Sequence, residues 1–218
     1  MLQLATQLFK LPYSNSGQDL DNSDTTNSYL NQKSSISIPI SYLHQMIITL
    51  IGFMGSGKSS IGRELADILS WNCIDLDYYI EDMERRSITT IFEKEGEASF
   101  RAAESKYLKE LLDRHHNLVL ALGGGAACQE QNWKLIQQST SIYLYRSNED
   151  LFQKLNARKA KRPLIANLND KHLREYIKNS MEIRSPYYSR ATYRVHVQPS
   201  KVKTAKQISQ YLVGSNNR

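Results

Sequence analysis

The segment Gly52-Phe53-Met54-Gly55-Ser56-Gly57-Lys58-Ser59 constrains this chain more than any other. It follows an apolar run at 47–51 that predicts a strand, and it leads into a stretch at 58–69 with helical spacing. A glycine-rich loop that joins a strand to a helix and ends in Lys-Ser is a Walker A loop. Its backbone N–H groups and the positive end of the helix dipole bind phosphate. We therefore expect a nucleotide to contact Gly55, Ser56, Gly57, Lys58, Ser59 and Ser60.

Two side chains of this loop have predicted roles in phosphate chemistry. Lys58 is expected to bridge the β- and γ-phosphates of ATP, and the Ser59 hydroxyl is expected to bind Mg²⁺. A glycine-rich turn that binds nothing is the alternative, which the strand–loop–helix context disfavours. The loop alone does not distinguish a small-molecule kinase from an ATPase, a GTPase or a nucleotide kinase.

The rest of the chain from Met46 onward alternates short apolar runs with amphipathic stretches. This alternation is typical of βα units, so we predict an α/β fold in which helices flank a five-stranded parallel sheet. The predicted strands are 47–51, 73–75, 118–122, 141–145 and 193–197, and the predicted helices are 58–69, 77–84, 98–115, 129–137, 148–157, 170–184 and 204–213.

Composition limits the setting in which the chain works. The net charge of +6 favours anionic ligands, but the dense basic runs of a nucleic-acid surface are lacking. Cys73 and Cys128 have neither metal-ligand nor disulfide spacing, so we expect a reducing compartment such as the cytoplasm. The apolar run at 46–51 is far shorter than the roughly 20 residues that cross a bilayer, so no membrane span is expected.

Residues 1–45 are rich in Ser, Asn, Gln, Thr and Asp and show no periodicity. We expect a mostly disordered extension, because a transit peptide would be rich in Arg and poor in acids, whereas this segment has no Arg and contains Asp19, Asp21 and Asp24. Met46 directly precedes the first predicted strand, so a start of translation at Met46 is a further hypothesis. The intact mass of the protein from its natural source tests it.

Two acids, Asp75 and Asp77, end the second predicted strand. Ligands lie at the carboxyl ends of strands in open parallel sheets, and strand alternation would point both acids to one side. One could then act on Mg²⁺ while the other accepts a hydrogen bond from an attacking hydroxyl. The alternative is that Asp77 only caps the following helix.

Arg101 and Glu104 lie in Phe100-Arg101-Ala102-Ala103-Glu104, which opens a predicted helix. An arginine near the N-terminal turn is not favoured by the helix dipole, so a carboxylate ligand held in a bidentate grip would explain it, with Glu104 one turn on fixing the guanidinium. An ordinary surface ion pair is the alternative.

Three glycines, Gly123, Gly124 and Gly125, follow the predicted strand at 118–122. A glycine run costs backbone entropy and usually indicates close approach to the main chain. Because the run lies at the ligand edge of the sheet, we expect it to form a floor for the substrate, with a simple tight turn as the alternative.

The stretch 156–168 is basic and contains Arg158, Lys159, Lys161, Arg162 and Pro163. It predicts a mobile lid from which Arg162 reaches the transferring phosphate, and a solvated basic loop is the alternative.

Arg184-Ser185-Pro186-Tyr187-Tyr188 ends a long predicted helix, where a proline stops the helix and an arginine suits the dipole.

Taken together, these motifs resemble the shikimate kinase family in identity, order and spacing, from about Met46 to the C-terminus. The motifs are 52–59, Asp75-x-Asp77, Phe100-Arg101-x-x-Glu104, Gly123-Gly124-Gly125, Arg162-Pro163-Leu164 and Arg184-x-Pro186-x-Tyr188. The resemblance implies a P-loop kinase fold with a lid, and ATP- and Mg²⁺-dependent phosphorylation of the shikimate 3-hydroxyl in aromatic amino acid biosynthesis.

The resemblance also implies a role for each residue. Asp77 would orient or deprotonate the hydroxyl, Asp75 would act on Mg²⁺ through water, and Lys58 and Arg162 would act on the phosphate. The substrate would be held by Arg101, Gly123, Gly124, Gly125 and Arg184. A further lid arginine matches either Lys154 or Arg158, and 198–201 offers no match for an adenine-side arginine.

Other functions share parts of this pattern. Gluconate kinases and nucleoside monophosphate kinases have the loop and the lid, and a silent relative that only binds nucleotide or a shikimate-like ligand is a different class of alternative. We expect an enzyme that acts as a monomer on a small molecule, without a nucleic-acid or membrane partner.

Overall fold

The computed structural model describes residues 46–162 and 164–214, which belong to one compact unit. The predicted extension over 1–45 and Pro163 of the predicted lid lie outside the described residues. Within the described residues, no helix is both long and apolar enough to cross a membrane.

Five described strands form one parallel sheet, as the sequence predicts. The structure gives their order as β2-β3-β1-β4-β5. The strands are β1 (Ile47–Ile51), β2 (Asn72–Asp75), β3 (Leu118–Ala121), β4 (Thr140–Tyr145) and β5 (Tyr193–His196). Strand β1 is central and pairs with β3 on one side and β4 on the other. The strand order therefore reverses beside β1, and this is where open α/β sheets bind ligands.

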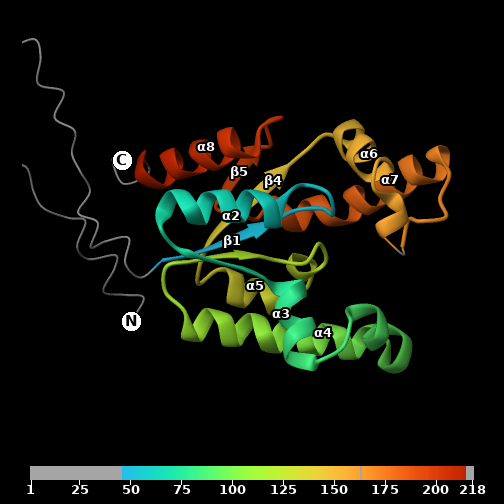
Figure 1. Ribbon diagram of the computed structural model, residues 1–218, viewed down its shortest axis with the longest axis horizontal. Coiled ribbons are helices and arrows are strands. Elements are labelled where there is room, and N and C mark those ends of the chain that lie inside the picture. Colours follow the sequence, from blue (N-terminus) through green and yellow to red (C-terminus); the bar gives the residue numbers. More distant parts are fainter. Residues whose placement is uncertain (1–45, 163, 215–218) are drawn as a thin grey trace, which may run out of the picture. The chain divides into compact units, whose positions relative to one another are not determined.

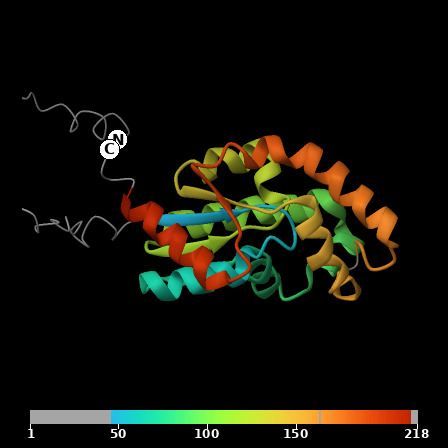
Figure 2. The same cartoon turned by 90° about the horizontal axis from the view of Figure 1, so that it is seen from above.

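Helices cover both faces of the sheet (Figure 1). They are α2 (Lys58–Leu69), α3 (Leu76–Glu84), α4 (Ile88–Arg114), α5 (Glu130–Ile136), α6 (Asn148–Asn156), α7 (Asp170–Tyr188) and α8 (Lys201–Gly214), with short 3₁₀ turns η2 (Ala126–Cys128) and η3 (Lys159–Lys161). Helices α2 and α8 lie on one face, and α3, α4 and α5 lie on the other (Figure 1). Figure 2 shows α7, in orange, extending past the carboxyl ends of the strands.

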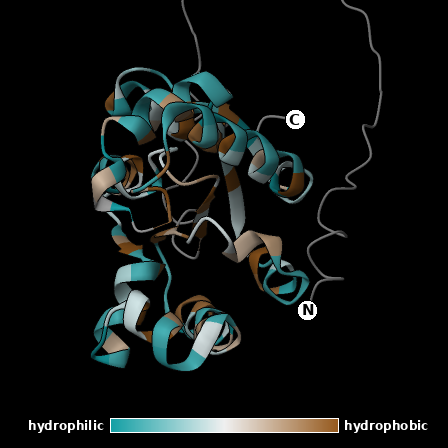
Figure 3. Ribbon diagram, turned by 90° about the vertical axis from the view of Figure 1, so that its right-hand side faces the viewer, coloured by the Kyte–Doolittle hydropathy of each residue, from teal (hydrophilic) through white to brown (hydrophobic). Residues whose placement is uncertain are grey.

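The central strand shows why the sheet needs two covering layers. All five residues of β1 are buried. Ile48 and Leu50 join the apolar cluster beneath α2 and α8, whereas Ile47 and Ile51 join the larger cluster beneath α3, α4, α5 and α7. Each such side chain stabilises the fold by about 1.5–3 kcal/mol when fully buried. Hydrophilic residues, coloured teal in Figure 3, make up much of the length of the helices.

Helix α4 differs from its prediction because it begins at Ile88, not near 98, and contains a break at Gly96 (φ 82°, ψ 176°). Ser87 caps the helix by accepting a hydrogen bond from the Thr90 N–H, and Ile91 anchors the first turn in the core. Because of this break, the apolar residues before Gly96 do not continue the helical spacing of those after it, so the sequence predicted only the later part of the helix. Arg101 consequently lies in the second turn after the break.

Helix α7 also differs, since it passes through Pro186 and ends at Tyr188, whereas the sequence predicted an end at 184. A proline inside a helix removes one backbone hydrogen bond. Beyond it, however, the Ser189 N–H still donates to the Ser185 carbonyl (2.9 Å), and Tyr188 is fully buried. Packing of Tyr188 therefore outweighs the local cost of the proline. The bounds of the remaining predicted elements are correct to within three residues.

Candidate active site

The loop between β1 and α2 has the backbone shape that its glycines predict. Gly52, Gly55 and Gly57 have φ values of 141°, 81° and 102°, which side chains disfavour. A Cβ on Gly52 would also lie 2.8 Å from the Leu144 carbonyl oxygen. Gly57 is the N-cap of α2, and among the described residues no side chain caps this helix end and no acid lies in its first turn. The open N–H groups of this turn fit a phosphate.

Lys58 lies across the base of this loop. Its Nζ donates to the carbonyl oxygens of Gly52 (2.8 Å) and Phe53 (3.1 Å). Burial lowers the pKa of Lys58 from 10.5 to about 8, although the carboxylates of Asp77 and Asp75 oppose this shift. The ammonium therefore stays largely charged at neutral pH. Ser60 turns its hydroxyl to the Gly57 carbonyl (3.0 Å) and so braces the loop.

Asp75 and Asp77 lie side by side, as the sequence predicts. The cause is not the alternation of side chains along a strand. Asp75 ends β2 and caps α3, accepting from the Asp77 N–H (3.1 Å) and from the Ser59 hydroxyl. Asp77 is helical and lies in the first turn of α3, so the predicted alternative of a capping role belongs to Asp75 and not to Asp77. The helix turn, rather than a strand pleat, brings both acids to one cleft.

The cleft beside these acids has a volume of about 440 Å³. Its lining residues are Met54, Ser59, Asp75, Asp77, Tyr78, Glu81, Ile88, Arg162 and Leu164. Burial, with help from Asp75, raises the pKa of Asp77 from 3.8 to about 6, while Lys58 opposes the rise. A carboxylate with this pKa is ionised at neutral pH and is still basic enough to accept a proton.

Arg101 is held by two carboxylates of its own helix. Its Nη1 donates to Glu104 Oε2 (2.9 Å), and its Nε and Nη2 donate to Glu97 Oε1 (3.1 and 3.0 Å). The Glu104 side chain is only 1% exposed, so the pair is not the ordinary surface ion pair that was the alternative. Glu104 is further fixed by Gln129, whose Nε2 donates to the same oxygen (3.0 Å).

The glycine run joins the acidic and basic groups of the site. A Cβ on Gly123 would lie 2.6 Å from Asp77 Oδ1, and one on Gly125 would lie 2.7 Å from Arg101 Nη2. The Gly124 carbonyl accepts from Arg184 Nη1 (3.4 Å) and from the Tyr188 hydroxyl (2.5 Å). Two carboxylates, those of Asp77 and Glu104, and two guanidinium groups therefore meet along this short segment.

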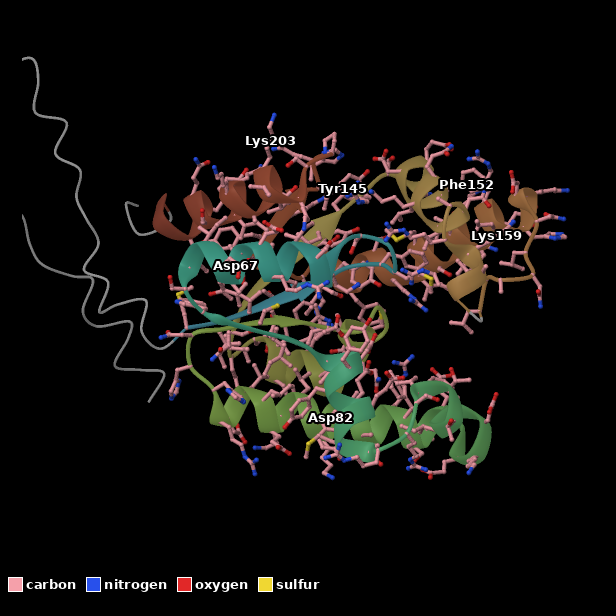
Figure 4. The ribbon with its side chains drawn as sticks, viewed as in Figure 1. Asp67, Asp82, Tyr145, Phe152, Lys159 and Lys203 are labelled. Carbon is pink, nitrogen blue, oxygen red and sulfur yellow. The ribbon has the colours of Figure 1, made fainter. Side chains whose placement is uncertain are left out.

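The predicted lid segment contributes Arg162 to the cleft. Lys154 and Arg158 are not among the lining residues, so the choice between them stays open. Closure of the lid remains a prediction. In Figure 4, Phe152 of α6 and Lys159 of η3 lie at the end of the structure toward which the strands point. A separate cavity of about 500 Å³ lies against β4, β5 and α7, and no predicted site residue lines it.

Sequence reasoning missed three contributors to this site. Tyr188 appeared only as part of a motif, and its role follows from the continuation of α7. Gln129 gave no local signal, because its partner Glu104 lies 25 positions away in the sequence. Arg146 did give a signal, since it is a charged residue directly after the buried strand β4.

The fold and this site define a P-loop kinase with a pocket for a small acceptor. The sequence model of the shikimate kinase family matches residues 54–214. A shikimate kinase of Flavobacterium johnsoniae is 40% identical over 152 residues, which are 69% of this chain and 88% of the relative. One of Prochlorococcus marinus (strain NATL2A) is 37% identical over 166 residues, 76% of this chain and 82% of the relative.

Solved structures agree with this result. The shikimate kinase of Acinetobacter baumannii in complex with shikimate has a TM-score of 0.74 and 33% identity, covering 83% of this chain and all of that chain (100%). That of Aquifex aeolicus has a TM-score of 0.68 and 34% identity, covering 78% of this chain and 98% of that one. The chain belongs to the shikimate kinase family.

Proposed function

We propose that this chain is a shikimate kinase, which transfers the γ-phosphate of ATP to the 3-hydroxyl of shikimate in aromatic amino acid biosynthesis. One observation carries the proposal: Asp77, Arg101 and Arg184 meet at the glycine run 123–125, and Asp77 shares a cleft with Ser59 of the P-loop. This arrangement supports an acceptor pocket directly beside the P-loop.

The acceptor pocket suits a small hydroxy acid. Shikimate carries a carboxylate and three ring hydroxyls, and two guanidinium groups match one carboxylate because arginine offers paired donors. Arg101 and Arg184 are our candidates for this contact, and the glycine run forms the adjoining floor. The related Acinetobacter baumannii structure that contains shikimate supports this choice of acceptor.

The donor side fits Mg²⁺. Mg²⁺ prefers oxygen ligands and keeps several waters, and the Ser59 hydroxyl lies hydrogen-bonded to the Asp75 carboxylate at the cleft. Ser59 would bind the ion directly and Asp75 through water. Within the described residues, no cluster of three or more His, Cys, Asp or Glu could hold a metal, so phosphate oxygens and water would complete the shell. The ion would neutralise charge on the phosphate oxygens held there.

In the proposed reaction, Asp77 accepts the proton of the 3-hydroxyl. That oxygen forms a bond to the γ-phosphorus, the bond from phosphorus to the β–γ bridging oxygen breaks, and ADP leaves. Lys58 and Arg162 are the cations that face the charge on the transferring group. The pKa of Asp77, about 6, leaves this carboxylate free to accept the proton at neutral pH.

Release of ADP tests the proposal when shikimate, gluconate and each nucleoside monophosphate are offered in turn with Mg²⁺ and ATP. We expect turnover with shikimate alone. Comparable turnover of gluconate or a nucleoside monophosphate would reassign the acceptor. Binding of ATP and shikimate without turnover would indicate a silent relative.

We also propose that the enzyme works as a monomer in a reducing compartment such as the cytoplasm. Cys73 and Cys128 are both free thiols, which supports the choice of compartment. Sedimentation of the active enzyme tests the oligomeric state, and fractionation of the source cells tests the compartment.

A further inference from the structure

Arg146 is a buried cation directly behind the P-loop. It lies between the end of β4 and Ser147, the N-cap of α6, and it is only 8% exposed. Its Nε donates to the Ser56 carbonyl oxygen at 3.3 Å. This contact joins β4 to the loop across 90 positions of sequence.

The charge of Arg146 has little compensation in the described part of the chain, where no carboxylate lies within ion-pair distance of it. Burial lowers the pKa of Arg146, and the Asp150 carboxylate opposes this only from a longer range. Buried charges are normally paired, because taking an ion out of water is costly. The fold therefore keeps a cation here that has no carboxylate partner among the described residues, and its terminal nitrogens are left to solvent.

The P-loop offers a way to use this cation. The Ser56 carbonyl belongs to the same planar peptide group as the Gly57 N–H. Gly57 is the N-cap of α2, where no side chain of the described residues occupies the N–H groups. A hydrogen bond to the carbonyl end of a peptide polarises its N–H end and strengthens the bond which that N–H donates. A guanidinium on the carbonyl side thus favours an anion on the N–H side.

We propose that Arg146 is a positioning residue of the nucleotide site, whose buried charge acts through the Ser56–Gly57 peptide to strengthen binding of the triphosphate. The proposal rests on the nucleotide site of the proposed function but not on the identity of the acceptor. The bound phosphates in turn supply the negative charge that Arg146 lacks in the protein.

The test measures nucleotide binding by calorimetry without any acceptor, so its result does not depend on which substrate is phosphorylated. The ligands are MgATP, inorganic triphosphate with Mg²⁺, and adenosine. For Arg146→Met we expect the Kd of MgATP and of triphosphate to rise about tenfold, the size expected for a hydrogen bond to a charged group, and adenosine binding to stay unchanged. Arg146→Lys keeps the charge, so it should stay within about threefold of the wild type.

A matched control is Arg63→Met, which removes the same charge from an exposed position on α2. Solvent screens an exposed charge, so this variant should bind MgATP normally. Equal weakening by Arg63→Met and Arg146→Met would overturn the proposal, because net charge would then explain both. Equal loss of adenosine and triphosphate binding in Arg146→Met would also overturn it.

Thermal unfolding separates this role from simple packing. If Arg146 acts for the phosphate, Arg146→Met without ligand should be at least as stable as the wild type, because an unpaired buried charge has been removed. The rise in Tm that MgATP causes should be smaller for Arg146→Met than for the wild type. A ligand-free variant that is destabilised but gains the full rise in Tm with MgATP would show that Arg146 is merely structural.

Discussion

Replacing Asp77 with Asn should make the protein more stable and much less active, and the two effects have one physical cause. The cleft holds the Asp77 carboxylate where burial and the neighbouring Asp75 disfavour its charge. An amide of the same shape carries no charge, so it avoids this cost. It also cannot accept a proton, and loss of a positioned base lowers turnover by about a hundredfold or more.

The size of the stability gain follows from the pKa of Asp77. Raising it from 3.8 to about 6 makes the ionised carboxylate cost about 3 kcal/mol in the folded protein, an upper bound because solvent reaches part of the group. Because the pKa of Asp77 is higher in the folded protein than in the unfolded chain, Asp77 costs no stability below the unfolded pKa, where it is protonated in both states. This advantage is lost as the pH rises through the folded pKa of about 6. Asp77→Asn should therefore gain up to about 3 kcal/mol at pH 7.5 and about 1 kcal/mol at pH 4.5.

Urea unfolding at these two pH values measures the gain, and ADP release measures turnover. The control is Asp67→Asn, which removes an exposed carboxylate on α2 (Figure 4) and should change neither quantity much. MgATP should bind Asp77→Asn with nearly its normal affinity. A gain in stability that does not depend on pH would refute the electrostatic reasoning, and full turnover would refute the assignment of Asp77 as the base.

Three further predictions concern the acceptor pocket. Arg101→Ala should raise the KM for shikimate about tenfold or more while the KM for ATP stays unchanged, and an unchanged shikimate KM would exclude Arg101 from the contact. Gly125→Ala should also raise the KM for shikimate, because the new Cβ would lie 2.7 Å from Arg101 Nη2 and would displace the guanidinium. Normal shikimate kinetics in this variant would show that the guanidinium can move aside. Gln129→Leu removes a donor to Glu104 and should raise the shikimate KM several-fold with little effect on kcat, whereas an equal fall in both substrate affinities would indicate general unfolding.

The shape of the P-loop could be predicted from the sequence because its parts are contiguous. Gly52 to Ser59, the strand before them and the helix after them form one continuous stretch, and positive φ values at three glycines give the motif a local physical meaning. The parallel sheet was predictable for a similar reason, since its central strands β1 and β3 are short apolar runs buried on both faces. The helix around Pro186 was not, because the buried Tyr188 decides where α7 ends.

The acceptor half depends on contacts between segments that are far apart in the sequence. Asp77, Arg101 and Arg184 come from three different helices, and only the folded chain shows that they converge. Local rules correctly placed Asp75 and Asp77 in one cleft but gave the wrong cause, because a helix begins between them where a strand was assumed to continue. Arg146 stood out as a charged residue directly after a buried strand, but its contact with Ser56, 90 positions away, could not be seen in the sequence.

The glycine run shows how the structure sharpens a sequence argument. Its backbone entropy cost predicted a close approach, and a bound substrate was the expected neighbour. The described contacts reveal nearer neighbours in the protein itself, since a Cβ at Gly123 would meet Asp77 and one at Gly125 would meet Arg101. Glycine is therefore required first to let Asp77 and Arg101 take their positions, and only then to leave room for a ligand. A substitution at Gly123 or Gly125 should consequently displace Asp77 or Arg101 even when no ligand is bound.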